Sequence, residues 1–138
     1  MSDLMPGLGD EPLLTLDDEQ RQLLSVLGDR LLAENKFEEA RSVYEVLLAS
    51  DRKNPFYNRA FGICCEQTNR MEEAKEALDR AINLDPQDAY AFTGRAAIRL
   101  REGDKEGALQ DLQAAQATPV GQKDPLAKRI AALMGSAQ

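Results

Sequence analysis

The sequence predicts an all-α fold: three tandem helical hairpins, stacked one after another, followed by a capping helix. The first observation behind this prediction is an internal repeat of 34 residues that occurs three times. The second is helical spacing of the apolar residues within each repeat. The third is composition, because 43% hydrophobic and 30% charged residues over 138 residues suit one globular unit with a buried core.

The repeats align when the segments that begin at Leu27, Phe61 and Arg95 are superimposed. In each segment a small residue is followed four residues later by a large apolar residue, and three residues after that by another apolar residue. These spacings place all three on one side of a helix, and the small residue allows a second helix to approach closely. The positions are Ala40, Tyr44 and Leu47; Ala74, Leu78 and Ala81; Ala108, Leu112 and Ala115. Each repeat is therefore predicted to be a helical hairpin.

The turns repeat in the same way. Asn35, Asn69 and Gly103 occupy one repeat position, and these residue types best tolerate the left-handed backbone at a helix end. Pro55 and Pro86 stand beyond the second helices, where a residue that cannot continue a helix is expected. The repeat region is thus predicted to span 15–122, with units at about 21–54, 55–88 and 89–122.

The two ends of the chain differ from the repeats. Residues 1–14 have no helical period and are predicted to form a flexible N-terminal arm, with the first helix beginning near Thr15 or Leu16. Residues 123–138 are predicted to form a capping helix and a tail, with Asp124 as N-cap and Pro125 at the first helical position. One side of this helix is apolar and holds Leu126, Ile130, Leu133 and Met134.

The third unit departs from the repeat pattern. Arg95 and Arg99 stand where the second unit has Phe61 and Cys65. Two cations in place of core residues lead us to expect that the first helix of this unit packs loosely or is rotated.

Several classes of function are disfavoured by composition. A net charge of −7 without a basic cluster argues against nucleic acid as a partner, and no run approaches the roughly 20 apolar residues of a membrane span. The N-terminal residues lack the features of a secretory signal, so we expect the cytoplasm. Cys64 and Cys65 are adjacent, which suits two core thiols better than a disulfide or a zinc site.

An enzyme is also disfavoured. The chain has no histidine, and it has no Gly-rich phosphate loop, nucleophile motif or set of metal ligands. The acidic pairs Glu38-Glu39 and Glu72-Glu73 are explained by their place in the first turn of a helix, where carboxylates favour the dipole. We therefore expect no catalytic residue, no cofactor and no metal.

The pattern of Leu27-Gly28, Phe61-Gly62, the three alanines and Pro86 resembles the tetratricopeptide-repeat family. This resemblance implies a right-handed solenoid whose concave wall is formed by the first helix of each unit and binds another polypeptide. The family's groove positions fall here on a set of residues that forms a largely apolar track. The expected peptide-binding groove comprises Leu32, Phe56, Arg59, Ile63, Tyr90, Thr93, Ala97 and Leu100.

Within the family, two kinds of groove are distinguishable. Co-chaperones that hold acidic heat-shock tails place Lys, Arg and Asn at five fixed positions, which hold Ser25, Asp29, Ala60, Tyr90 and Gly94 here. The acidic chain, the apolar groove and the final helix instead resemble the class II chaperones of bacterial type III secretion translocator proteins. That resemblance implies a cytoplasmic chaperone that holds an extended or amphipathic apolar segment of a secreted translocator.

Two alternatives stay open. The first alternative is a scaffold or adaptor subunit of another multiprotein assembly, in which the same groove holds a permanent partner. The groove is also suited to a second copy of the chain, which would give a homodimer.

Overall fold

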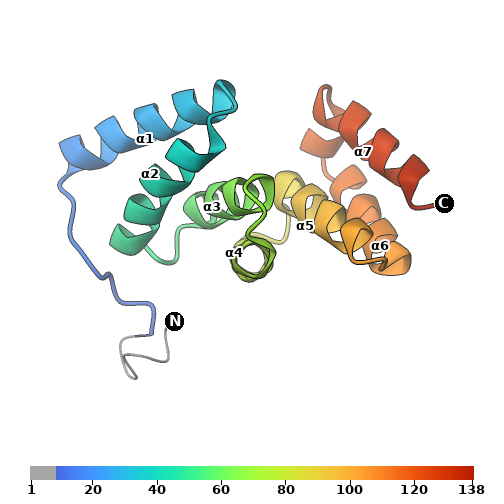
Figure 1. Cartoon of the computed structure of the whole chain (residues 1–138), viewed down its shortest axis with the longest axis horizontal. Helices are drawn as coiled ribbons and strands as arrows, with labels where there is room; N and C mark the ends of the chain where they lie inside the picture. The colour runs from blue at the N-terminus through green and yellow to red at the C-terminus, as the bar shows by residue number, and fades with distance from the viewer. Residues whose placement is uncertain (1–8) are drawn as a thin grey trace.

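The computed structural model describes residues 9–138, which form seven α-helices and one short 3-10 helix, without a β-strand (Figure 1). The all-α prediction is therefore confirmed. The elements are α1 (Asp18–Ala33), α2 (Phe37–Ser50), α3 (Pro55–Gln67), α4 (Met71–Leu84), α5 (Ala89–Arg101), α6 (Lys105–Gln116), the 3-10 helix (Val120–Gln122) and α7 (Leu126–Ser136).

The helices form an arch (Figure 1). Successive helices pair as hairpins, α1 with α2, α3 with α4 and α5 with α6, and α7 packs against α5 and α6. In Figure 1, α1 and α7 stand at the two ends on the same side of the arch, α3 and α5 lie between them, and α4 and α6 lie on the outer side. No helix of the described region has both the length and the hydropathy of a membrane span.

The turns within the hairpins follow the prediction. Asn35, Asn69 and Gly103 have φ values of 58°, 65° and 82°, so each adopts the left-handed conformation that ends a helix. The start of the first helix was predicted too early, because α1 begins at Asp18. Asp17 caps it: its side chain accepts a hydrogen bond from the backbone N–H of Gln20, whose side chain accepts one from the N–H of Asp17.

The repeated small residues bring the helices close together. Ala40, Ala74 and Ala108 are fully buried. Two glycines also have no room for a side chain. A Cβ at Gly62 would lie 2.8 Å from Cγ of Leu78, and a Cβ at Gly28 would lie 2.9 Å from the ring of Tyr44. The hairpin core therefore depends on side chains that leave room for a large residue of the facing helix.

The two cysteines are core residues, as predicted. Cys64 and Cys65 are unpaired and fully buried in the cluster that joins the first two hairpins. Burial raises the pKa of each thiol to about 12 from an ordinary 9.0. The thiols are therefore protonated at neutral pH.

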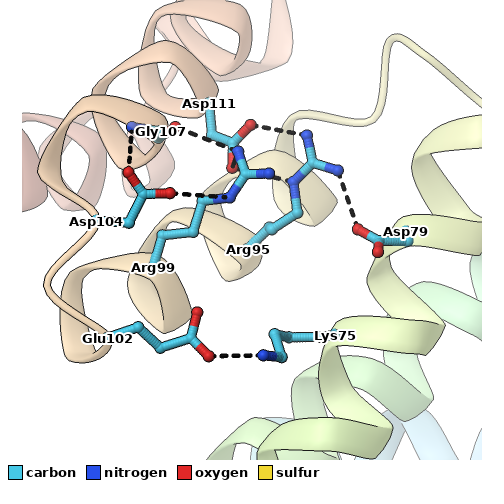
Figure 2. Close-up of polar contacts among 8 residues, drawn as sticks. All are labelled: Lys75, Asp79, Arg95, Arg99, Glu102, Asp104, Gly107 and Asp111. Atoms are coloured by element: carbon cyan, nitrogen blue, oxygen red, sulfur yellow. Dashed lines mark hydrogen bonds and ion pairs between the residues drawn. The ribbon is translucent and has the colours of Figure 1, made fainter.

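The expectation that the first helix of the third unit packs loosely was wrong, because its two arginines bind an aspartate of the facing helix (Figure 2). Arg95 donates two hydrogen bonds to the buried Asp111, 3.0 Å from Nε and 2.8 Å from Nη2, and Arg99 donates a third at 2.9 Å. Arg95 also donates to Asp79 of α4 at 3.0 Å. The hydrogen bond with Asp111 raises the pKa of Arg95. Charge pairing at these two positions thus adds to the apolar packing between α5 and α6.

The final helix differs from its prediction at one end. It begins at Leu126, after Pro125, and Asp124 does not cap it but lies 3.7 Å from Nζ of Lys128. Its apolar side is as expected: Leu126 and Ile130 are buried with α5 and α6, and Leu133 and Met134 pack beside them.

Part of the predicted arm lies against α2. The backbone N–H of Leu13 donates to the carbonyl of Ala49 at 2.9 Å, and Asp10 lies 3.4 Å from Lys53. The remainder of the arm, residues 1–8, lies outside the described residues.

Candidate functional site

A pocket of about 250 Å³ opens on the inner side of the arch, between α3, α5 and α7. Its apolar walls come from Ile63 of α3, Tyr90 of α5 and Leu126 at the start of α7, with Pro125 beside them. Thr93 and Gly94 belong to α5, while Glu66 and Arg129 contribute the charged groups. The pocket can therefore accept an apolar side chain next to polar groups.

Tyr90 is presented by the start of α5. The Asp88 side chain caps this helix by accepting a hydrogen bond from the N–H of Ala91 at 3.2 Å. Tyr90 follows in the first turn and remains 40% exposed, although its neighbours Ala89 and Ala91 are buried. A large aromatic side chain that stays this exposed beside a pocket is available to a ligand.

Arg59 lies between the two aromatic residues of the expected groove, Phe56 and Tyr90. Its guanidinium carbon lies 4.8 Å from the ring centroid of Phe56 and 5.1 Å from that of Tyr90, and its Nε donates to Asp88 at 3.0 Å. Phe56 also packs edge-on against Tyr44, with the ring centroids 5.9 Å apart. The expected apolar track is therefore interrupted by a cation at this point.

Glu66 contributes a second ion pair to the inner surface. It is only 3% exposed, and its carboxylate lies 2.7 Å from Nη2 of Arg101, so the pair joins α3 to α5. The Gln67 side chain donates a further hydrogen bond to this carboxylate at 3.1 Å. Since the charge of Glu66 is already neutralised, it does not make the pocket acidic.

The predicted groove residues are only partly brought together. Ile63, Tyr90 and Thr93 line the pocket, and Phe56 and Arg59 lie beside it. The other three have packing contacts instead: Leu32 packs against the core of the first two hairpins, Ala97 is buried, and Leu100 packs against the core of the third hairpin.

The pocket residues at the start of α7 and just before it were not predicted. Pro125, Leu126 and Arg129 complete the wall, although the sequence indicated only that this helix caps the stack. The signal was present, because a helix that follows the last hairpin takes the place of the first helix of a further unit and so joins the inner wall.

The α1 end of the inner surface has a different character. A shallow polar cleft there is lined by five polar side chains of α1, with Val26 and with Tyr57 of α3. The hydroxyl group of Tyr44 donates a hydrogen bond to Asp29 across the first hairpin, and burial together with this bond raises the pKa of Tyr44. In residues 9–138 no cluster of His, Cys, Asp or Glu is suited to a metal ion.

Comparison with known proteins supports the repeat assignment. The family model described as "Tetratricopeptide repeat" matches residues 31–98. Among curated proteins, the chain is similar to the probable UDP-N-acetylglucosamine–peptide N-acetylglucosaminyltransferase SPINDLY of Arabidopsis thaliana, with 35% identity over 85 residues. The match covers 62% of this chain and 9% of that protein, and the tomato (Solanum lycopersicum) protein of the same name matches at 36% over 53% of this chain and 8% of its own length. The chain thus spans about a tenth of these relatives.

Solved structures share the fold at low sequence identity. PcrH from Pseudomonas aeruginosa superimposes with a TM-score of 0.75 at 22% identity, over 91% of this chain and 96% of PcrH. The Yersinia enterocolitica type III secretion chaperone SycD, in complex with a peptide of the translocator YopD, gives 0.73 at 20% identity over 88% and 94%. The TPR2AB domain of yeast Sti1, in a complex with pHSP90, gives 0.73 at 17% identity over 88% and 48%. Residues 31–98 therefore match the tetratricopeptide-repeat family, and the fold of the chain resembles that of the type III secretion translocator chaperones.

Proposed function

We propose that this protein is a cytoplasmic chaperone that holds an apolar segment of a secreted translocator against the inner side of its arch. The observation that carries the proposal is the pocket between α3, α5 and α7, where Tyr90 remains exposed beside Ile63 and Leu126. Burying one large apolar side chain there is worth about 1.5–3 kcal/mol before ordering costs. Several contacts along the arch would then give useful affinity.

The proposed mechanism is masking rather than catalysis. The protein covers an apolar segment that would otherwise aggregate, and it releases the segment by dissociation, without nucleotide, cofactor or metal. The similarity to SycD, which was solved with a peptide of YopD, supports this kind of ligand. The polar cleft at the α1 end adds a region where the ligand's polar residues would lie.

The experiment is a pull-down from the source cell with three baits: the natural protein, Tyr90→Ala and Val46→Ala. Val46 is the matched control, since it is an exposed apolar residue of α2 that does not line the pocket. We expect a secreted protein with a long apolar segment to be recovered with the natural protein and with Val46→Ala, and to be lost with Tyr90→Ala. Recovery with all three baits would place the binding surface elsewhere.

A scaffold or adaptor subunit is the second candidate. The exposed apolar side chains of α1, Leu23, Val26 and Leu27, favour it, because they offer a second surface for a further subunit or copy. Size-exclusion chromatography of a cell extract separates the two functions. A chaperone elutes with a small, exchanging pool of client, whereas a scaffold subunit elutes in one stable assembly.

A further inference from the structure

We infer that the pocket selects a peptide in which a carboxylate lies beside the apolar anchor, and that Arg129 of α7 binds this carboxylate. This inference rests on the proposed function and adds a second chemical requirement to its ligand. It begins from the position of Arg129, which is exposed, belongs to the pocket lining and follows the buried Leu126 by three residues. The two side chains therefore lie on neighbouring positions of one helix side.

Of the charged residues that line the pocket, Glu66 has an ion-pair partner and Arg129 has none among the described residues. Glu66 is neutralised by Arg101 and Arg59 by Asp88. Even the neighbouring Lys128 pairs with Asp124. Arg129 takes part in no ion pair within residues 9–138. The pocket rim is therefore locally positive on a chain whose net charge is −7.

Charge complementarity then defines the ligand. The apolar walls from Ile63, Tyr90 and Leu126 receive a side chain such as leucine or phenylalanine, and the guanidinium at the rim favours an Asp or Glu close to that residue. The negative field of the whole chain repels acidic peptides at long range. A preference for peptides that contain Asp or Glu must therefore come from a short-range contact. Such a preference can be assigned to one residue, Arg129.

The test uses labelled synthetic peptides that share a central leucine and differ in the residues on either side, which are Glu, Gln or Lys. Binding is measured by fluorescence anisotropy against the natural protein, Arg129→Gln, Arg129→Glu, Arg30→Gln and Tyr90→Ala. Arg30 is the matched control, because it is an exposed arginine of α1 outside the pocket. Circular dichroism checks that each variant is folded.

We expect the natural protein and Arg30→Gln to bind the Glu peptides about fivefold more tightly than the Gln peptides. The difference should vanish in Arg129→Gln and turn into a preference for Lys in Arg129→Glu. It should also shrink between about 0.05 and about 0.5 M NaCl, because salt screens an exposed pair.

Two failures are distinguishable. Equal binding of Glu and Gln peptides, with all binding still weakened by Tyr90→Ala, would overturn the role of Arg129 and leave the groove in place. If no peptide shows binding that depends on Tyr90, the proposed function of the pocket fails, and the preference for acid fails with it.

Discussion

At the scale of single residues, Arg59 has the largest effect on the apolar character of the inner surface. Its guanidinium occupies the faces of Phe56 and Tyr90, and cation–π contacts of this kind are each worth about 0.5–2 kcal/mol. Because Arg59 also binds Asp88, the N-cap of α5, one side chain fixes α3 to α5. The same residue therefore stabilises the arch and limits the apolar surface that a ligand can reach.

Gly62 is a position where one methyl group should matter. Gly62→Ala would place a Cβ 2.8 Å from Leu78, so we expect the free energy of unfolding to fall by about 1–3 kcal/mol. Gly135→Ala is the matched control, because nothing lies within 4 Å of its Cβ position in α7, and it should be neutral or stabilising by up to about 1 kcal/mol. Urea unfolding measures both, and equal effects would contradict the close approach of α3 and α4.

The two buried thiols predict a loss of stability at alkaline pH. Their pKa is about 12 in the folded protein and 9.0 ordinarily, so above pH 9.0 the unfolded chain releases thiol protons that the folded chain retains. The contribution is fully present below pH 9.0 and falls as the pH rises, by at most about 1.4 kcal/mol per pH unit for each thiol.

Urea midpoints at several pH values check this slope. Cys64→Ala/Cys65→Ala should show a weaker decline above pH 9.0 than the natural protein, whatever its stability at neutral pH. An unchanged slope in the double variant would show that the thiols do not cause the decline.

At the scale of elements, the third hairpin is held by a buried carboxylate (Figure 2). Asp111 is 3% exposed and accepts hydrogen bonds from Arg95 and Arg99. The hairpin prediction succeeded because the small residues, the left-handed turns and the caps are local signals. The expectation of loose packing failed because the partner of Arg95 lies 16 residues away, and a pattern of apolar residues does not register such a pair.

Removal of that carboxylate should be costly. Asp111→Ala leaves two arginines without their shared partner, so we expect a loss of about 3–5 kcal/mol. Asp79→Ala removes an exposed partner of the same Arg95 and should cost less than about 1 kcal/mol. Urea unfolding compares the two, and a loss in Asp111→Ala as small as that in Asp79→Ala would mean that Asp111 does not hold the hairpin together.

At the scale of the whole molecule, the arch is unequally supported along its length. Of the other elements, α1 packs substantially only against α2, whereas α3 packs against α2, α4 and α5. Solenoids derive their stability from such neighbour contacts. The α1 end should therefore open locally at a lower free-energy cost than the centre.

Hydrogen exchange followed by mass spectrometry tests this gradient. Amides of α1 should exchange well before those of α3 and α4, at a neutral pH where the fold is intact. The fragment that contains α2 serves as internal reference, since α2 contacts both neighbours. Protection in α1 equal to that in α3 would contradict unequal support.

The packing of the helices against one another limits how much of the candidate site the sequence could predict. Ile63, Tyr90 and Thr93 were placed by the repeat register, which fixes the inner side of each first helix. The pocket wall from Arg129 depends on how α7 packs on α5 and α6. That orientation arises from contacts between elements and has no counterpart in the repeat.

The helices that line the pocket are synthesised in a fixed order. During synthesis, α3 emerges first, α5 follows, and the wall that contains Leu126 and Arg129 is made last. The first two hairpins are therefore complete in sequence while the pocket still lacks its third wall. If the pocket binds as proposed, a chain becomes competent only when α7 has docked, and an immature chain would not compete with finished molecules for the ligand.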